Sequence, residues 1–153
     1  MPAVDVGRKG MGIKMILTLW ILLFLAVNSL KDIRKREISL RLTAGFAIAG
    51  IVRAVCLKIM SAEYFAALGI GGFVMMLSGM SGGAIGIGDG LVLLALGTVM
   101  TWQELGYILM RGIFCCSICS VIILLLPRRN RKTQIPFVPF ILMGYIGGLI
   151  FER

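Results

Sequence analysis

With 153 residues, 59% of them hydrophobic, and a mean hydropathy of +0.98, the chain is more apolar than soluble domains, whose apolar content is about 45–50%. This composition excludes a soluble protein and indicates one polytopic membrane domain over residues 1–153, with room for about six spans of ~20 residues. The net charge of +9 does not indicate nucleic-acid binding, because the basic residues are not gathered with aromatic residues on one soluble face.

The apolar runs, taken in chain order, predict an all-α membrane protein with a bundle of six transmembrane helices. Residues 1–12 are polar and Gly-containing, and we expect them to be flexible. The predicted spans cover about 13–30, 40–57, 62–80, 90–100, 105–126 and 135–151. The fourth run is short and needs residues on both sides of it to cross the membrane. The first run is predicted to be retained rather than cleaved as a signal peptide, because a basic stretch and no small-residue cleavage site follows it.

Basic residues are concentrated in two predicted loops. Nine of the sixteen Lys and Arg residues lie there: Lys31, Arg34, Lys35, Arg36, Arg41, Arg128, Arg129, Arg131 and Lys132. Loops rich in Lys and Arg mark the cytoplasmic side of a membrane, where they also contact anionic lipid headgroups. With six spans, the first, third and fifth loops share that side. Asp32 and Asp89 are in the first and third loops, so we expect them to lie on the same face.

Asp32 and Asp89 are the candidate functional residues, because a carboxylate at the edge of a hydrocarbon layer is costly and therefore a functional hypothesis. Asp89 lies in the glycine-rich stretch Gly86-Ile87-Gly88-Asp89. Two carboxyl groups that share a proton can act together as acid and base, as in aspartic proteases. Three alternatives remain open. Asp32 could only balance nearby positive charge, Asp89 could be a helix N-cap, and the Asp89 turn could line an ion path.

The chain contains no His, which excludes Ser-His and Cys-His triads and HExxH zinc sites. Cys116 and Cys119 have CxxC spacing, but a zinc site requires further ligands. We interpret these thiols as small apolar residues of a membrane helix. No metal and no cofactor are predicted.

Three stretches resemble the signature of the type IV prepilin peptidases, membrane aspartic proteases of the GxGD class that include the preflagellin peptidases. They are Asp32-Ile33-Arg34-Lys35-Arg36-Glu37-Ile38-Ser39, Gly86-Ile87-Gly88-Asp89, and Lys132-Thr133-Gln134-Ile135-Pro136-Phe137-Val138-Pro139-Phe140. The last is similar to the IPFGPF segment of the family. The three stretches occur in the family's order, and the resemblance extends over roughly residues 15 to 150.

The chain departs from the family pattern at three places. Ser39 and Leu40 stand where the family usually has Pro and Asn, and Leu91 stands where it has Lys. Val138 replaces the Gly of IPFGPF. The missing Lys puts local electrostatics or a substrate contact in question, because a nearby cation would stabilise ionised carboxylates.

The resemblance implies an aspartic endopeptidase of the short, peptidase-only form, without the N-methylation region. Its substrate would be a type IV prepilin or pseudopilin that loses a basic leader at the cytoplasmic face of the plasma membrane. Asp32 and Asp89 would be catalytic, and Gly86 and Gly88 would provide backbone that admits the substrate. Pro136 is expected to begin the last helix, where a missing N–H is tolerated.

Two other functions remain open at this stage. The first is a small transporter or channel component in which Asp89 binds a cation. The second is a catalytically silent homologue that acts in assembly, which the departures at Ser39 and Leu91 suggest. The sequence specifies neither the pilin nor the oligomeric state.

Overall fold

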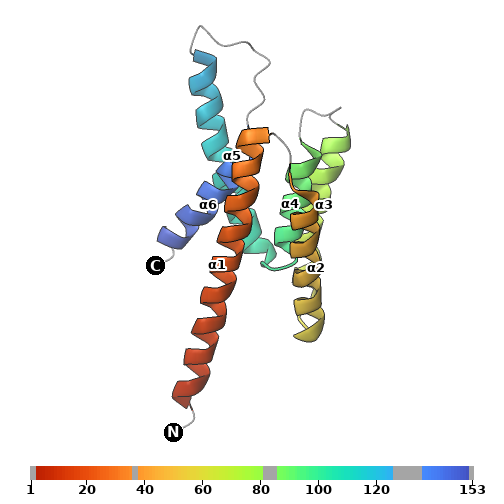
Figure 1. Ribbon diagram of the computed structural model, residues 1–153, viewed down its shortest axis with the longest axis vertical. Helices are drawn as coiled ribbons and strands as arrows, with labels where there is room; N and C mark the ends of the chain where they lie inside the picture. The colour runs from red at the N-terminus through yellow and green to blue at the C-terminus, as the bar shows by residue number, and fades with distance from the viewer. Residues whose placement is uncertain (1–2, 36–37, 81–85, 126–135, 152–153) are drawn as a thin grey trace.

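The computed structural model describes residues 3–35, 38–80, 86–125 and 136–151, and every regular element among them is an α-helix (Figure 1). The helices are α1 (Ala3–Lys35), α2 (Leu40–Cys56), α3 (Ala62–Met80), α4 (Ile87–Gly97), α5 (Trp102–Leu125) and α6 (Val138–Phe151). The prediction of an all-α protein is thus confirmed for these residues. Since α1 begins at Ala3, it includes most of residues 1–12, and their flexibility stays a prediction.

The number of spans differs from the prediction of six. Three segments among the described residues are long and apolar enough to cross a membrane: Gly12–Arg34, Ala62–Met80 and Trp102–Ile122. The remaining helices are shorter, with 17 residues in α2, 11 in α4 and 14 in α6. At 1.5 Å per residue, α6 extends about 21 Å, less than the ~30 Å of a bilayer core. The six-span prediction is therefore corrected to six helices, of which three have the length and composition of a span.

The burial of α4 explains why its apolar run was predicted to be a span. In α4, the side chains of Val92, Leu93, Ala95 and Leu96 are fully buried within the protein. Its hydrophobicity therefore serves the protein core, whereas the helices of span length keep most of their surface exposed. Hydropathy alone cannot separate these cases, because burial in protein and burial in lipid both favour apolar side chains.

Glycines allow the closest helix contacts. A Cβ at Gly90 of α4 would lie 2.8 Å from the Met75 Cα of α3, and one at Gly97 would lie 2.8 Å from the Ala67 carbonyl oxygen. In the same way, a Cβ at Gly144 of α6 would approach the Ile108 carbonyl oxygen of α5 to 2.8 Å. Small residues that bring helix backbones together are typical of membrane helix packing.

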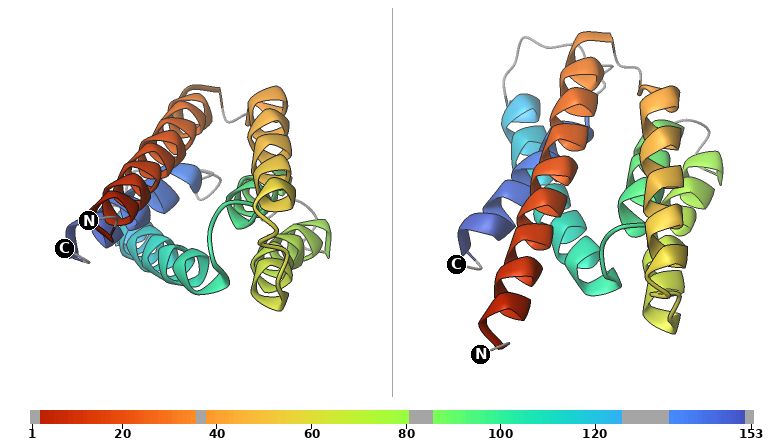
Figure 2. Two further views of the ribbon diagram at one scale, coloured as in Figure 1. Left: turned by 90° about the horizontal axis from the view of Figure 1, so that it is seen from below. Right: turned by 60° about the horizontal axis from the view of Figure 1, so that its bottom comes forward.

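The helices form two groups, which Figure 2 shows from below and obliquely. In the first group, α2 and α3 pack against α4, and in the second, α1 and α5 pack against α6. Across the boundary between the groups, which we call the seam, α5 contacts α3 and α4, and α1 contacts α2. Phe24 of α1 stacks on Phe46 of α2 with ring centroids 4.0 Å apart, and Trp20 lies 4.4 Å from the same ring.

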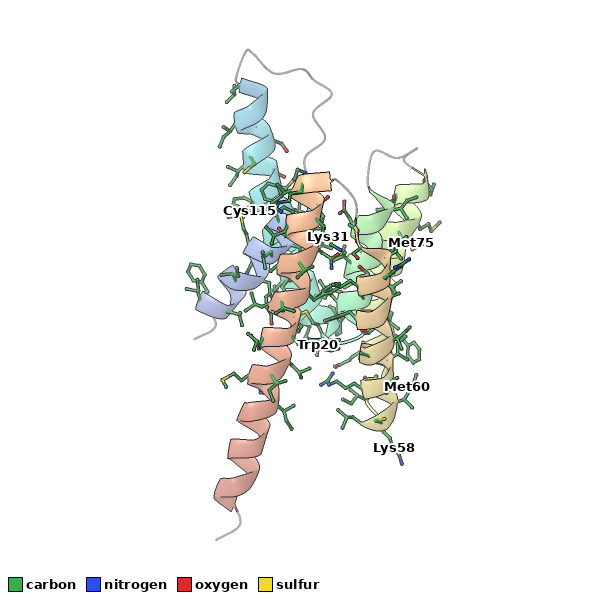
Figure 3. All side chains as sticks on the ribbon, in the orientation of Figure 1. Trp20, Lys31, Lys58, Met60, Met75 and Cys115 are labelled. Atoms are coloured by element: carbon green, nitrogen blue, oxygen red, sulfur yellow. The ribbon has the colours of Figure 1, made fainter. Side chains whose placement is uncertain are left out.

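Successive helices run in opposite directions, so α1 rises and α2 descends in Figure 1, and α3 and α4 repeat this pair. The C-terminal end of α1 and the N-terminal end of α4 therefore lie toward the same end of the molecule. Figure 3 labels Lys31 near this end and Lys58, after α2, at the opposite end.

Candidate functional site

Asp32 lies in the last turn of α1, with only 8% of its surface exposed. Its Oδ2 accepts a hydrogen bond of 3.2 Å from the backbone N–H of Val138, the first residue of α6. The first N–H groups of a helix have no partner within the helix and are available to an acceptor of this kind. The positive end of the α6 dipole adds a favourable interaction with the carboxylate. This end of α6 therefore fixes the position of the Asp32 carboxyl group.

Asp89 lies in the first turn of α4, on the other side of the seam. The N-cap of α4 is Gly86, which has extended backbone angles (φ −66°, ψ 126°) and accepts a 3.0 Å hydrogen bond from the Asp89 N–H. Asp89 is thus not the N-cap, and its side chain is partly exposed. The local sequence therefore leaves the Asp89 carboxyl group available for another role.

The two carboxyl groups interact electrostatically across the seam. Burial, and secondarily the negative charge of Asp32, raises the pKa of Asp89 from 3.8 to about 6. Asp89 lies at the start of α4, outside the helices that are long enough to span a membrane. Asp32 and Asp89 come from opposite helix groups and are separated by 57 positions in the sequence, so tertiary packing alone brings them together. This arrangement pairs a carboxyl group that accepts a helix N–H with one that is protonated more readily than an ordinary Asp, which suits paired acid and base chemistry.

Gly86 and Gly88 surround Asp89 for two different steric reasons. A Cβ at Gly86 would lie 3.1 Å from Asp89 Oδ2, so any side chain there would restrict the carboxyl group. A Cβ at Gly88 would collide with the side chain of Ile38, including its Cβ at 3.2 Å. Gly88 therefore lets the residues before α2 pack against the start of α4, while Gly86 leaves space around the acid.

Pro136 does not occupy the position expected for it. The last helix begins at Val138, two residues after Pro136, and Pro139 lies in its first turn. Because Pro139 has no N–H, the first turn of α6 loses one donor at no cost to the helix. Residues 132–135 of the third motif lie outside the described part of the chain, as do Arg128, Arg129 and Arg131.

Asn28 and Thr43 are buried polar residues that our sequence interpretation did not include. Asn28 is fully buried one turn before Asp32 and donates a 3.1 Å hydrogen bond from Nδ2 to the Phe24 carbonyl oxygen. Its Oδ1, like the Thr43 hydroxyl, has no hydrogen-bond partner among the described residues. The signal was present in the sequence, because an Asn four residues before Asp32 shares its helix face.

The cysteines do not form disulfides in the described residues, where all four are free. Cys116 of α5 lies close enough to Asp89 for electrostatic interaction between the two groups, so α5 also borders the site. Among the same residues, no group of three or more His, Cys, Asp or Glu side chains could hold a metal ion.

Comparison with known proteins identifies the family. Searches of curated proteins and of solved structures gave no match. The model of the type IV leader peptidase family matches residues 17–151, a range that contains Asp32, Asp89 and the start of α6. Because this match covers most of the chain, the protein belongs to the type IV leader peptidase family and is a membrane protease of the aspartic type.

Proposed function

We propose that this protein is an endopeptidase that removes the leader peptide from a type IV prepilin or pseudopilin, with Asp32 and Asp89 as its catalytic residues. Membership of the family supports the reaction class. The observation that supports the residues is the environment of Asp89: burial, and secondarily the negative charge of Asp32, raises its pKa to about 6. No metal or cofactor takes part in the proposed reaction.

The environments of the two carboxyl groups suggest their roles. Asp32, held by the Val138 N–H, is the base that takes a proton from water as the water oxygen attacks the scissile carbonyl carbon. Asp89, with its raised pKa, is the acid that donates a proton to the carbonyl oxygen. The C–N bond then breaks as Asp32 returns its proton to the leaving amine, and Asp89 recovers a proton from the diol. Opposite protonation states of paired acids are the basis of aspartic protease chemistry.

The seam is the proposed position of the substrate peptide. Asp32 and Asp89 lie on different helix groups, so an extended peptide between them would present its carbonyl group to both. Gly86, which is exposed at the start of α4, leaves open backbone beside Asp89. The apolar helix of the substrate would remain in the bilayer against the exposed faces of the protein.

The proposed active site faces the cytoplasm. Lys31 and Arg34 are exposed in the last turns of α1, next to Asp32. Basic residues at the end of a membrane helix favour the cytoplasmic side. The protein would therefore be a multi-pass protein of the cytoplasmic membrane that cleaves its substrate on the inner side.

Co-expression with a tagged prepilin tests this proposal. Asp32→Asn and Asp89→Asn keep the shape of each side chain and remove its acid–base function, so each is expected to slow leader removal by about 10²–10⁴-fold. Glu63→Gln is the matched control, since Glu63 is an exposed acid in the first turn of α3, and it should cleave at the normal rate. Normal processing by both Asn variants would exclude the carboxyl pair. A wild-type protein that is folded but never cleaves would instead favour an assembly role.

A further inference from the structure

A second polar site lies at the end of the molecule opposite Asp32 and Asp89. A cavity of about 370 Å³ is lined by residues from α1, α2, α5, α6 and the turn between α4 and α5. Lys14, which lines it, precedes Asp32 by 18 residues on the same helix, a distance of about 27 Å along α1. The cavity is therefore separate from the proposed catalytic site.

Cationic side chains predominate among the charged groups of this cavity. Lys14 of α1, Arg53 of α2 and Arg111 of α5 line it, and Glu104 is the single acid among the described lining residues. The Glu104 carboxylate accepts a 3.1 Å hydrogen bond from the Thr101 N–H, and so belongs to a capping box at the start of α5. The lining thus carries a net charge of about +2, contributed by three helices, and favours an anionic ligand.

The polar groups are also held in place by their neighbours. A Cβ at Gly148 would lie 2.5 Å from the Arg111 Nη1, so the guanidinium group lies in the space beside Gly148. Tyr145 is buried, and its hydroxyl shares a hydrogen bond with the Thr18 side chain. Both residues line the cavity. A planar guanidinium beside hydroxyl groups and further cations suits the tetrahedral oxygens of a phosphate group.

The position of the cavity relative to the spans also agrees with a phosphate ligand. The spans Gly12–Arg34 and Trp102–Ile122 both contribute residues of their first turn to the cavity, Lys14 and Glu104, so the cavity lies between the starts of two candidate membrane spans. Tyr107 lines the cavity, and both it and Met110 of α5 have largely exposed side chains, 61% and 71%. Charged side chains within membrane helices generally face such cavities, and a basic lining attracts anionic groups.

We propose that this cavity binds a phosphate group, supplied either by an anionic phospholipid headgroup or by a soluble phosphate. The ligand contacts both helix groups, because Arg53 belongs to one and Lys14 and Arg111 to the other. It thereby holds the seam together at the end remote from Asp32 and Asp89. The binding site does not depend on the proposed protease function, and its test measures binding directly.

Native mass spectrometry and thermal unfolding of the full-length chain in detergent provide this test. Phosphatidylglycerol, phosphatidylcholine and inorganic phosphate are added separately. A lipid site retains phosphatidylglycerol over phosphatidylcholine and raises the unfolding temperature only with the anionic lipid. A site for soluble phosphate shows the same rise with inorganic phosphate alone. Either result supports the proposal, and the choice between them identifies the source of the phosphate.

Substitutions then locate the site. Arg53→Gln and Arg111→Gln are each expected to weaken retention of the ligand about tenfold, the effect of losing one charge-assisted hydrogen bond of about 1.4 kcal/mol or more. Lys58→Gln is the matched control, because Lys58 is an exposed cation at the same end of the molecule that does not line the cavity. Should Arg111→Gln fail to fold, Arg53→Gln near the end of α2 still decides the question. Equal retention by the Arg53 and Lys58 variants, or no preference among the three ligands, overturns the proposal.

Discussion

The backbone N–H of Val138 donates a 3.2 Å hydrogen bond to Asp32 Oδ2 and thereby joins two residues 106 positions apart. The donor is a main-chain group, so the identity of the side chain at position 138 does not determine whether the bond forms. This explains how Val138 can stand where the family signature has Gly. The start of α6 acts on the carboxylate through its backbone and its dipole.

Val138→Pro is expected to lower the rate of leader cleavage. Proline removes the N–H that Asp32 accepts, yet it is tolerated at the first position of a helix. A hydrogen bond to a charged group contributes about 1.5–3 kcal/mol, so the loss corresponds to about a 10–100-fold decrease in kcat/KM. Val138→Ala retains the N–H and loses only methyl groups, and it serves as the control in the same peptide cleavage assay. Equal rates for the two variants would show that this hydrogen bond has no part in catalysis.

The pH dependence of cleavage is predicted from the raised pKa of Asp89. As the proposed acid, Asp89 must carry a proton, and burial with the charge of Asp32 sets its pKa at about 6. The cleavage rate should therefore fall as the pH rises above about 6, approaching about tenfold per pH unit. Initial rates on a synthetic prepilin peptide between pH 4.5 and 8 measure this. A rate that increases throughout this range would reverse the assignment of acid and base.

Asp89→Asn is expected to increase stability at neutral pH, although it slows cleavage by about 10²–10⁴-fold. Between pH 3.8 and about 6, folded Asp89 holds a proton that the unfolded chain has released, so the free energy of unfolding falls as the pH rises through this window. The Asn side chain does not titrate and therefore avoids this decrease in the free energy of unfolding. At about 1.4 kcal/mol per pKa unit, the decrease is at most about 3 kcal/mol. The unfolding temperature in detergent should be lower at pH 7 than at pH 4 for the wild type. The difference between the two pH values should be smaller for the variant. Parallel changes in both proteins would mean that burial of Asp89 does not destabilise the fold.

Gly88→Ala is expected to lower both stability and activity, because its Cβ would collide with the side chain of Ile38. Overpacking of this kind costs about 1–3 kcal/mol, and here it would also displace the first turn of α4 that carries Asp89. The double variant Gly88→Ala/Ile38→Ala removes the colliding atoms and should recover a large part of both losses. Gly45→Ala is the control, since nothing lies within 4 Å of a Cβ at Gly45.

Unfolding temperature and cleavage rate are measured for all of these glycine variants. If the Ile38 substitution restores neither property, the contact between Ile38 and Gly88 is not the reason for a glycine at that position. If Gly45→Ala is as harmful as Gly88→Ala, the effect belongs to helix glycines in general and not to this contact.

Much of the secondary structure was predictable, because long apolar runs bounded by polar or glycine-rich stretches indicate helices. The third run was predicted at residues 62–80, the extent of α3 (Ala62–Met80). The number of spans was not predictable in this way. The apolar residues of α4 are buried by neighbouring helices, as Val92 and Leu96 show, and hydropathy does not report which medium surrounds a side chain.

The sequence by itself determined the helical class of the protein, its membrane character and the two aspartates worth testing, since these follow from composition and from the cost of acids near lipid. Only the tertiary structure decided that the Val138 amide hydrogen-bonds Asp32, that Ile38 packs against Gly88, and that cations from α1, α2 and α5 share a cavity. The physical reason is that such contacts join residues far apart in the chain. They depend on the distances and orientations of packed helices, which the local sequence pattern does not encode.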